Sequence, residues 1–185
     1  MKPILLDFPD EIWTPRLHIR APRPGDGAAV SEAVNESLDE LRPWMPWAQH
    51  GPTPEESEEV SRRAHARFLL REDLSLWLFD RATGEFVGGS GLHRINWDVP
   101  KFEIGYWLRT SRTGHGYMTE AVEAITAFVF ETLHARRVEI RCDARNTRSA
   151  GVAERAGFTL EGILHNYVQD VSGALTDVRV HARVR

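Results

Sequence analysis

Cysteine is nearly absent from this sequence, since Cys142 is the single one among 185 residues. One cysteine excludes an intrachain disulfide, which is typical of proteins from a reducing cytoplasm. No apolar run is long enough to span a bilayer, and the first residues, from Met1 to Asp7, lack the apolar segment of a secretion signal. These absences predict a cytoplasmic protein with no membrane partner.

An excess of charge of either sign is also missing, because the formal net charge is −4 and the basic residues are scattered. Direct nucleic-acid binding, which usually requires a basic patch, is therefore not expected. The eight histidines include no two within one helical turn, so no zinc-type spacing and no metal site are expected. The G-x-S-x-G nucleophile elbow and the G-x-x-x-x-G-K-[ST] phosphate loop are absent as well.

The hydrophobic periodicity predicts a mixed α/β fold of about seven strands and four helices. Strands are expected at 16–20, 74–80, 85–94, 102–108, 138–142, 158–171 and 174–184, and helices at 26–38, 53–70, 118–129 and 146–156. The helix between strands 102–108 and 138–142 makes that pair parallel, and the sheet before residue 109 is antiparallel. We expect one domain over residues 12–185, after a lead-in of residues 1–11 that Ile4, Leu5 and Phe8 dock onto it.

Local signals predict where the helices begin and end. Asp26 and Asn146 are candidate N-caps, and Thr53 with Glu56 three residues later has the spacing of a capping box. Gly157 is placed to end the last helix in the left-handed conformation.

The turn between strand 102–108 and the following helix contains Gly114 and Gly116. Glycines here let the backbone approach a ligand, and the free amides of the first helical turn, up to Thr119, favour an anion. Arg109 and Arg112 would add positive charge. The turn is therefore a candidate pyrophosphate cradle, although a glycine-eased turn without a ligand explains the glycines equally well.

Trp44 and Trp47 stand between prolines in a segment that cannot be a regular helix or a central strand. They form either a hydrophobic clasp on the core or a substrate-binding wall beside a cleft.

Five segments share a pattern with a known family: RPWMPW at 42–47, FEIGYWL at 102–108, GHGYMTEA at 114–121, NTRS at 146–149 and ERAGFTLEG at 154–162. Together they resemble the GNAT acetyltransferases, and more narrowly the RimJ/RimL branch, which acetylates protein N-termini, classically those of ribosomal proteins. The resemblance extends over about residues 14–183.

This resemblance implies acetyl-CoA as the cofactor. Its pantetheine arm would run between strands 102–109 and 138–142, which are expected to splay apart, beside Ile104 and Tyr106, with a hydrogen bond from Asn146. Its pyrophosphate would lie on the cradle formed by Gly114, His115, Gly116, Tyr117, Met118 and Thr119. The family pattern Q/R-x-x-G-x-G/A has Thr113 in its first position and Met118 in its last, but the cradle acts through backbone amides.

The resemblance also implies direct attack of an amine on the thioester, with a backbone N–H near Ile104–Tyr106 stabilising the oxyanion. Ser149 matches the serine proposed to serve the leaving thiolate, and Cys142 matches a cysteine near the sulfur of CoA. The glutamate proposed as the base in this branch falls on Val168, so Glu103 is the predicted substitute. The alternatives are a first-turn helix serine for Ser149 and a strand salt-bridge partner for Glu103.

The missing glutamate favours an acceptor amine that is easily deprotonated. An α-amino group titrates near ~7.7–8.0, whereas a lysine near ~10.4 costs roughly 3–4 kcal/mol to deprotonate at neutral pH. The predicted acceptor is a protein N-terminus. A small amine (drug, polyamine or metabolite) and a CoA-binding module without turnover are the alternatives. Many relatives are homodimers, so a homodimer is also expected.

Overall fold

The computed structural model describes residues 2–185, which form one eight-stranded sheet in the order β1-β2-β3-β4-β5-β6-β8-β7. The strands are β1 (Glu11–Trp13), β2 (Leu17–Arg20), β3 (Leu74–Asp80), β4 (Phe86–Asn96), β5 (Lys101–Leu108), β6 (Arg137–Asp143), β7 (Thr159–Gln169) and β8 (Leu175–Val184). The helices are α1 (Gly27–Leu41), α2 (Pro54–Leu69), α3 (Tyr117–Glu131) and α4 (Thr147–Arg155), with short 3₁₀ turns η1 (Pro3–Leu5), η2 (Pro46–Ala48) and η3 (Thr110–Arg112). Within residues 2–185, no helix combines the length and the apolarity that crossing a bilayer requires.

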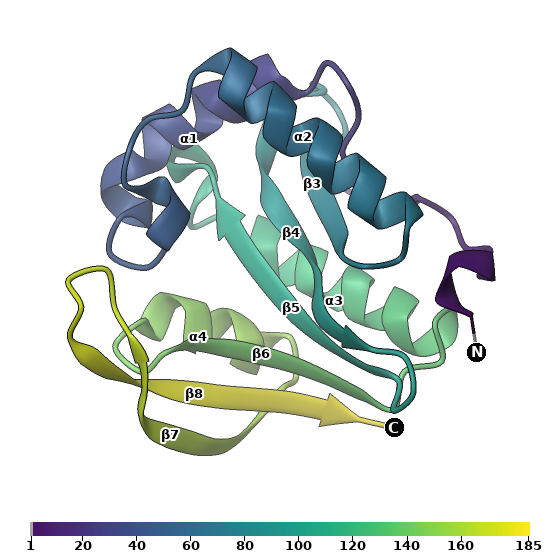
Figure 1. Ribbon diagram of the computed structural model, residues 1–185, viewed down its shortest axis with the longest axis vertical. Helices are drawn as coiled ribbons and strands as arrows, with labels where there is room; N and C mark the ends of the chain where they lie inside the picture. Colours follow the sequence, from purple (N-terminus) through teal and green to yellow (C-terminus); the bar gives the residue numbers. More distant parts are fainter. Residues whose placement is uncertain (1) are drawn as a thin grey trace.

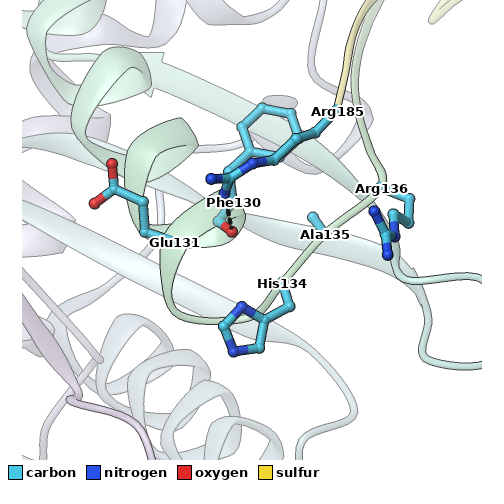
Figure 2. A pocket seen from close by; sticks show the side chains of 6 residues that line it. All are labelled: Phe130, Glu131, His134, Ala135, Arg136 and Arg185. Carbon is cyan, nitrogen blue, oxygen red and sulfur yellow. Dashed lines mark hydrogen bonds between the residues drawn. The ribbon is translucent and has the colours of Figure 1, made fainter.

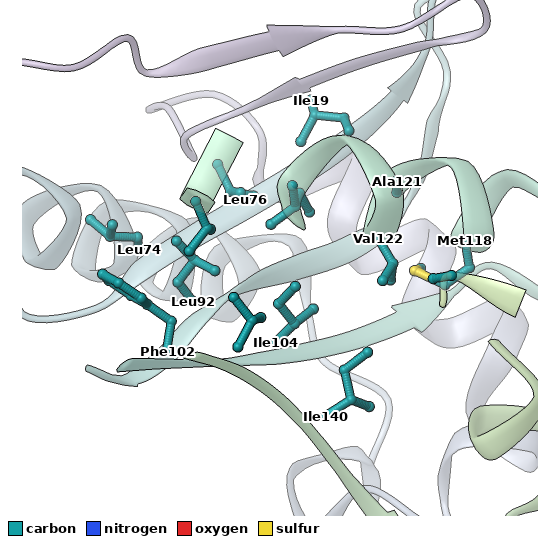
Figure 3. Close-up of a cluster of buried hydrophobic side chains, with 14 of the residues drawn as sticks. Ile19, Leu74, Leu76, Leu92, Phe102, Ile104, Met118, Ala121, Val122 and Ile140 are labelled. Atoms are coloured by element: carbon teal, nitrogen blue, oxygen red, sulfur yellow. The ribbon is translucent and has the colours of Figure 1, made fainter. Parts of the chain in front are cut away.

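The sheet is covered on both faces, by α1 and α2 on one and by α3 and α4 on the other (Figure 1). Side chains alternate along each strand. In β4 and β5, Leu92, Phe102 and Ile104 pack with Met118 and Val122 of α3 in the main core (Figure 3). Their neighbours Glu103 and Gly105 therefore lie on the face covered by α1 and α2, which we call the acceptor face.

The second core lies under α1, where Val30, Ala33 and Val34 pack against Trp77 and Phe86. Full burial of side chains of this size contributes about 1.5–3 kcal/mol each, so the two cores hold the sheet between its helix layers.

The pairing of β5 with β6 is parallel and short, running from Lys101↔Arg137 to Glu103↔Glu139. After Glu103, β5 stays paired with β4, while β6 stays paired with β8, and the two strands diverge (Figure 1). The backbone groups of alternate residues in 104–108 consequently have no strand partner on the β6 side. The predicted splaying between these strands is confirmed, and we call the place where β5 and β6 part the opening.

The sequence prediction of about seven strands was one short. The additional strand is β1, whose three residues pair antiparallel with β2, and a segment of this length carries no readable period. In the lead-in before it, Phe8 packs edge-on against Phe68 and Phe128, whereas Ile4 and Leu5 are exposed. Met1 lies outside the described residues.

Three of the four predicted helix signals are confirmed. Thr53 and Glu56 form a complete capping box, Asn146 Oδ1 accepts the amide of Ser149, and Gly157 adopts φ +77° after α4. Asp26 precedes α1 but does not cap it, because Arg20 donates to both of its carboxylate oxygens, at 2.6 and 2.9 Å.

Candidate active site

The glycine turn opens α3 with a set of free amides. Gly114 and Gly116 have φ of +80° and +78°, a conformation in which an L side chain is strained. Gly116 is the N-cap of α3 and provides no capping side chain, so the amides of Tyr117, Met118 and Thr119 have no partner within the helix. Unpaired amides at the positive end of a helix dipole form an anion site.

The cradle is held in place by Arg16, which the sequence did not single out. Its Nη1 donates to the carbonyl of His115 at 2.8 Å, and its Nε donates to Glu120 at 2.6 Å. Thr14 donates its hydroxyl to the same Glu120 carboxylate at 2.6 Å. Burial raises the pKa of Glu120, but the hydrogen bonds from Thr14 and Arg16 outweigh this, so its pKa lies below the usual value.

Both arginines predicted to assist the cradle are engaged with carboxylates. Arg109 contacts Glu32 and Glu36 of α1 at 2.5 Å and Glu85 at 3.2 Å. Arg112 also pairs with Glu85. Arg109 thus joins α1 to the end of β5, and contact of either guanidinium with a phosphate stays a prediction.

We call the face covered by α3 and α4 the donor face. At the opening, this face carries a pair of hydroxyl groups. Tyr106 donates its phenol to the carbonyl of Ser149 at 2.8 Å, and the Ser149 hydroxyl lies 3.1 Å from the Tyr106 oxygen. Asn146 Oδ1 accepts the Ser149 amide at 3.0 Å. The structure therefore brings Tyr106 together with Asn146 and Ser149, which lie 40 and 43 residues after it in the sequence.

Burial sets the protonation of this unit. It raises the pKa of the Tyr106 phenol well above its usual value, with only partial opposition from Ser149. Burial likewise raises the pKa of the Cys142 thiol, and the Ser149 hydroxyl partly offsets the effect. Both groups are protonated at neutral pH, so the donor face presents O–H and S–H groups rather than anions.

On the acceptor face, Glu103 forms ion pairs with Arg94 and, at 3.5 Å, with Arg141. Glu103 pairs in register with His93 of β4, whose Nδ1 lies 2.7 Å from a carboxylate oxygen of Asp73. This histidine–aspartate pair was not recognised in the sequence.

The aromatic loop after α1 reaches the same face. Trp47 meets Trp107 of β5 edge-on at 5.8 Å, and it is 53% exposed. Trp44 is 36% exposed. A Cβ at Gly89 would lie 2.6 Å from the indole nitrogen of Trp107, so the glycine leaves the space that this ring occupies. The loop leaves both indoles partly exposed, and we call it the half-open aromatic wall.

Two surface hollows of similar size lie outside the opening. One, of about 420 Å³, lies beside the C-terminal end of α3 and is lined by Phe130 of α3, His134 of the following turn and Arg185 at the end of the chain, among others (Figure 2). It is separated from the cradle by the length of α3, about 22 Å. The other, of about 410 Å³, adjoins the cradle at Arg16 and Tyr117. The chemistry argues for the opening, because the Tyr106–Ser149 hydroxyls lie on one side of β5, the His93 ring lies over Gly105 on the other, and the cradle follows β5 in the chain.

Comparison with known proteins decides the family. The family model described as acetyltransferase (GNAT) domain matches residues 16–159. This chain belongs to the GNAT acetyltransferase family.

Individual GNAT relatives agree with this assignment. The ribosomal-protein-serine acetyltransferase of Escherichia coli is 35% identical over 163 residues, which cover 84% of this chain and 90% of that protein. The structure of RimL, a ribosomal L7/L12 α-N-protein acetyltransferase in complex with coenzyme A, superposes with a TM-score of 0.85 at 25% identity, covering 92% of this chain and 95% of RimL. The microcin C7 self-immunity acetyltransferase MccE, in complex with acetyl-CoA and AMP, has a TM-score of 0.86 at 20% identity, with 93% and 94% covered.

The GNAT assignment makes this protein an N-acetyltransferase and confirms the predicted family and fold. Sequence reasoning missed three groups: the Arg16–Glu120 pair at the cradle, the His93–Asp73 pair over β5, and Arg155, whose Nε lies 3.4 Å from the Thr119 hydroxyl at the cradle. Each joins residues distant in the chain. For the histidine, the sequence signal was the pair of facing glycines at 91 and 105, because the His93 ring occupies the space that their side chains would fill.

Proposed function

We propose that this GNAT enzyme transfers an acetyl group from acetyl-CoA to the α-amino group of a protein N-terminus, with a ribosomal protein as the acceptor. The proposal is supported by the E. coli ribosomal-protein-serine acetyltransferase, which matches most of both chains. The observation that carries it is the half-open aromatic wall, because Trp44 and Trp47 remain exposed beside the opening. An extended peptide end can enter such a face, whereas a small amine is better held by an enclosed pocket.

The residues present fit acetyl-CoA. The uncapped amides of α3 and the two left-handed glycines suit a pyrophosphate, and the diverging β5 and β6 leave backbone groups free beside Asn146 for an amide-bearing arm. Met118 contributes only its amide, since its side chain is buried in the core. When bound, acetyl-CoA supplies the acetyl group as an activated thioester.

The protein divides the remaining chemistry between the two faces of the sheet. On the donor face, Ser149 can turn its hydroxyl from Tyr106 toward a sulfur, because a hydroxyl rotates freely between partners. On the β6 side of β5, the free backbone amides of alternate residues in 104–108 are placed to stabilise negative charge on a carbonyl oxygen. The acceptor face receives the amine and must remove its proton. Glu103 as that proton acceptor stays a prediction.

The test is thiol release from acetyl-CoA in the presence of matched amines. One peptide begins with a free serine, and a second has the same sequence with a blocked N-terminus and an internal lysine. Polyamines and aminoglycosides complete the panel. We expect release with the first peptide alone, at kcat/KM at least tenfold above every other amine, and mass spectrometry should locate the acetyl group on its α-nitrogen. Release with small amines only would replace the acceptor class, and CoA binding without any release would remove the enzymatic role.

We further propose that the protein works in the cytoplasm, where a ribosomal acceptor is made, and that it forms a homodimer, which the exposed apolar side chains Leu160, Ile163 and Val168 of β7 favour. Analytical ultracentrifugation at micromolar concentration should give twice the mass of the chain. A monomer at all concentrations would refute the dimer and leave the acetyl transfer unaffected.

A further inference from the structure

Asp73, which immediately precedes β3, holds the ring of His93 through its Nδ1 atom. Its Oδ2 lies 2.7 Å from Nδ1 of His93, and its Oδ1 accepts the hydroxyl of Ser75 at 2.9 Å. Burial raises the pKa of Asp73, but the contacts with His93 and Ser75 outweigh it, so the carboxylate stays ionised at neutral pH. Both carboxylate oxygens are engaged, and the Asp73 side chain is only 17% exposed, so the pair is held in one geometry.

The ring lies above two glycines that face each other across β4 and β5. A Cβ at Gly91 would lie 2.9 Å from Cε1 of His93. A Cβ at Gly105 would lie 3.0 Å from Cδ2 and 3.3 Å from Nε2. The imidazole therefore occupies space that any other residue at these positions would fill. It is brought over the strand segment that follows the last β5–β6 pair.

The outer nitrogen of this ring is available for chemistry. In the part of the chain that the structure describes, Nε2 of His93 makes no hydrogen bond, and 36% of the side chain is exposed. It points over Gly105, at the opening between the donor and acceptor faces. A general base needs such a lone pair within hydrogen-bond reach of the proton, directly or through one water.

We infer that His93 accepts the proton of the acceptor amine and that Asp73 is the positioning residue that fixes its ring and its tautomer. The inference rests on the proposed acetyl transfer and deepens it by naming the base. Glu103 is the less suitable group because Arg94 and Arg141 already occupy its carboxylate. Besides Asp73, four elements bring charged groups toward the His93 ring. Glu103 of β5 lies beside it and is paired with Arg94 of β4 and Arg141 of β6, and Arg67 of α2 lies near Asp73.

In the transfer step, one bond forms, one bond breaks and one proton leaves the amine. The amine nitrogen forms a bond to the acetyl carbon, the carbon–sulfur bond breaks, and sulfur keeps the bonding pair as a thiolate. The proton that nitrogen loses moves to Nε2 of His93, which then releases it to solvent, while solvent or the Ser149 hydroxyl supplies a hydrogen to sulfur. Nε2 can accept only if Nδ1 carries the ring proton, and donation from Nδ1 to Asp73 enforces that tautomer.

The decisive measurement is the pH dependence of kcat/KM with saturating acetyl-CoA and whichever amine the enzyme acetylates best. At pH below both titrations, the rate requires loss of one proton from the amine and one from the base, so log(kcat/KM) should rise with a slope of 2. In His93→Asn, kcat/KM should fall about 100-fold at pH 7, and log(kcat/KM) should rise with a slope of only 1, which belongs to the amine. Glu103→Gln should keep the slope of 2.

The chain offers a matched control in a second histidine–aspartate pair. Nδ1 of His165 lies 2.8 Å from Asp177 on β7 and β8, at the opposite edge of the sheet from β1. His165→Asn should leave both rate and slope unchanged. A slope of 2 in His93→Asn, or a slope of 1 in Glu103→Gln, would overturn the inference.

A second readout needs no turnover. In the ligand-free protein with ¹⁵N-labelled histidine, the ring of His93 should be the Nδ1–H tautomer, and Asp73→Asn should shift it toward Nε2–H while lowering kcat about tenfold or more. An Nε2–H tautomer in the wild-type protein would overturn the assignment. If the enzyme acetylates small amines only, the proposal of a protein N-terminus as acceptor is refuted. The pH slopes measured with such an amine would still test His93. Failure to acetylate any amine would overturn both proposals.

Discussion

Ser149 has two hydrogen-bonding groups with separate duties. Its amide is accepted by Asn146 and belongs to the cap of α4, whereas its hydroxyl lies against the phenol of Tyr106 at the opening. The cap survives any change of the side chain. A substitution at this residue can therefore separate local helix stability from chemistry at the donor face.

Ser149→Ala should lower kcat about 10- to 100-fold, because the leaving sulfur loses its nearest hydroxyl and general acid assistance is typically worth 10²-fold or more. The Kd for CoA should change less than about twofold, since Asn146 keeps its contact with the residue 149 amide. Thiol-release kinetics and calorimetry measure the two quantities.

Ser172→Ala is the matched control, because that serine also donates its hydroxyl within a local turn, to Asp170, but at the far end of β7. It should alter neither quantity. An unchanged kcat in Ser149→Ala, with Tyr106→Phe severely impaired, would transfer the donor role to the phenol.

At the scale of the elements, the helix boundaries were predictable wherever the signal was local. Thr53, Asn146 and Gly157 act on backbone groups within three residues of themselves, so their chemistry is legible in the sequence. Asp26 was misread because Arg20, which binds it, stands across a turn.

The base was not predictable for a related reason. His93 and Asp73 are brought together only by the register of the β3–β4 hairpin, and the role given to Glu103 could not anticipate two guanidinium partners. The glycine turn, in contrast, lies in one continuous segment, so its left-handed glycines and free amides could be predicted, and its contact with a pyrophosphate stays a prediction.

The cradle gives a prediction that compares two glycines in the same backbone conformation. Gly116 and Gly173 have φ of +78° and +85°, so alanine at either should cost about 1 kcal/mol in the free energy of unfolding. Only Gly116→Ala should also weaken CoA binding, by about tenfold, because only that turn presents amides to a phosphate. Urea denaturation and calorimetry would show this, and equal CoA affinity in the two variants would remove the cradle from the site.

The contacts of Arg109 predict a structural role for a residue that the sequence assigned to cofactor binding. Its side chain is 11% exposed and meets three carboxylates, two of them on α1. Arg109→Met should lower the free energy of unfolding by about 2 kcal/mol, because it leaves like charges crowded together. The Kd for CoA should stay within about twofold. A large loss of affinity with unchanged stability would restore the phosphate-binding role.

At the scale of the whole molecule, two halves of the sheet meet along a short seam. β5 and β6 share only the pairs up to Glu103↔Glu139, and ion pairs reinforce the place where they part. Glu139 binds Arg137 and Arg141, and Arg141 continues to Glu103. The opening can exist beyond this point because the core under α3 and the charge network, rather than continuous strand pairing, hold the halves together.

His181 of β8 ties global stability to pH. Its side chain is fully buried, and in the described chain neither ring nitrogen has a hydrogen-bond partner. Burial lowers the pKa of His181, with Glu154 opposing only in part. The folded protein therefore keeps the ring neutral, whereas the unfolded chain binds a proton below pH ~6.5. The unfolding free energy should be insensitive to this residue above pH 7 and fall below pH ~6.5, by up to ~1.4 kcal/mol per pH unit.

His181→Leu removes both the titration and the unpartnered nitrogens, so its unfolding free energy should decline less steeply than that of the wild-type protein between pH 7 and 5. Carboxylates lose their contribution mainly at lower pH, which leaves this window to histidine. Urea denaturation at half-unit pH steps gives the two slopes, and the exposed His50→Gln should follow the wild type. If His181→Leu and wild type decline in parallel, another group carries the proton, and the burial of His181 has no consequence for the pH dependence of stability.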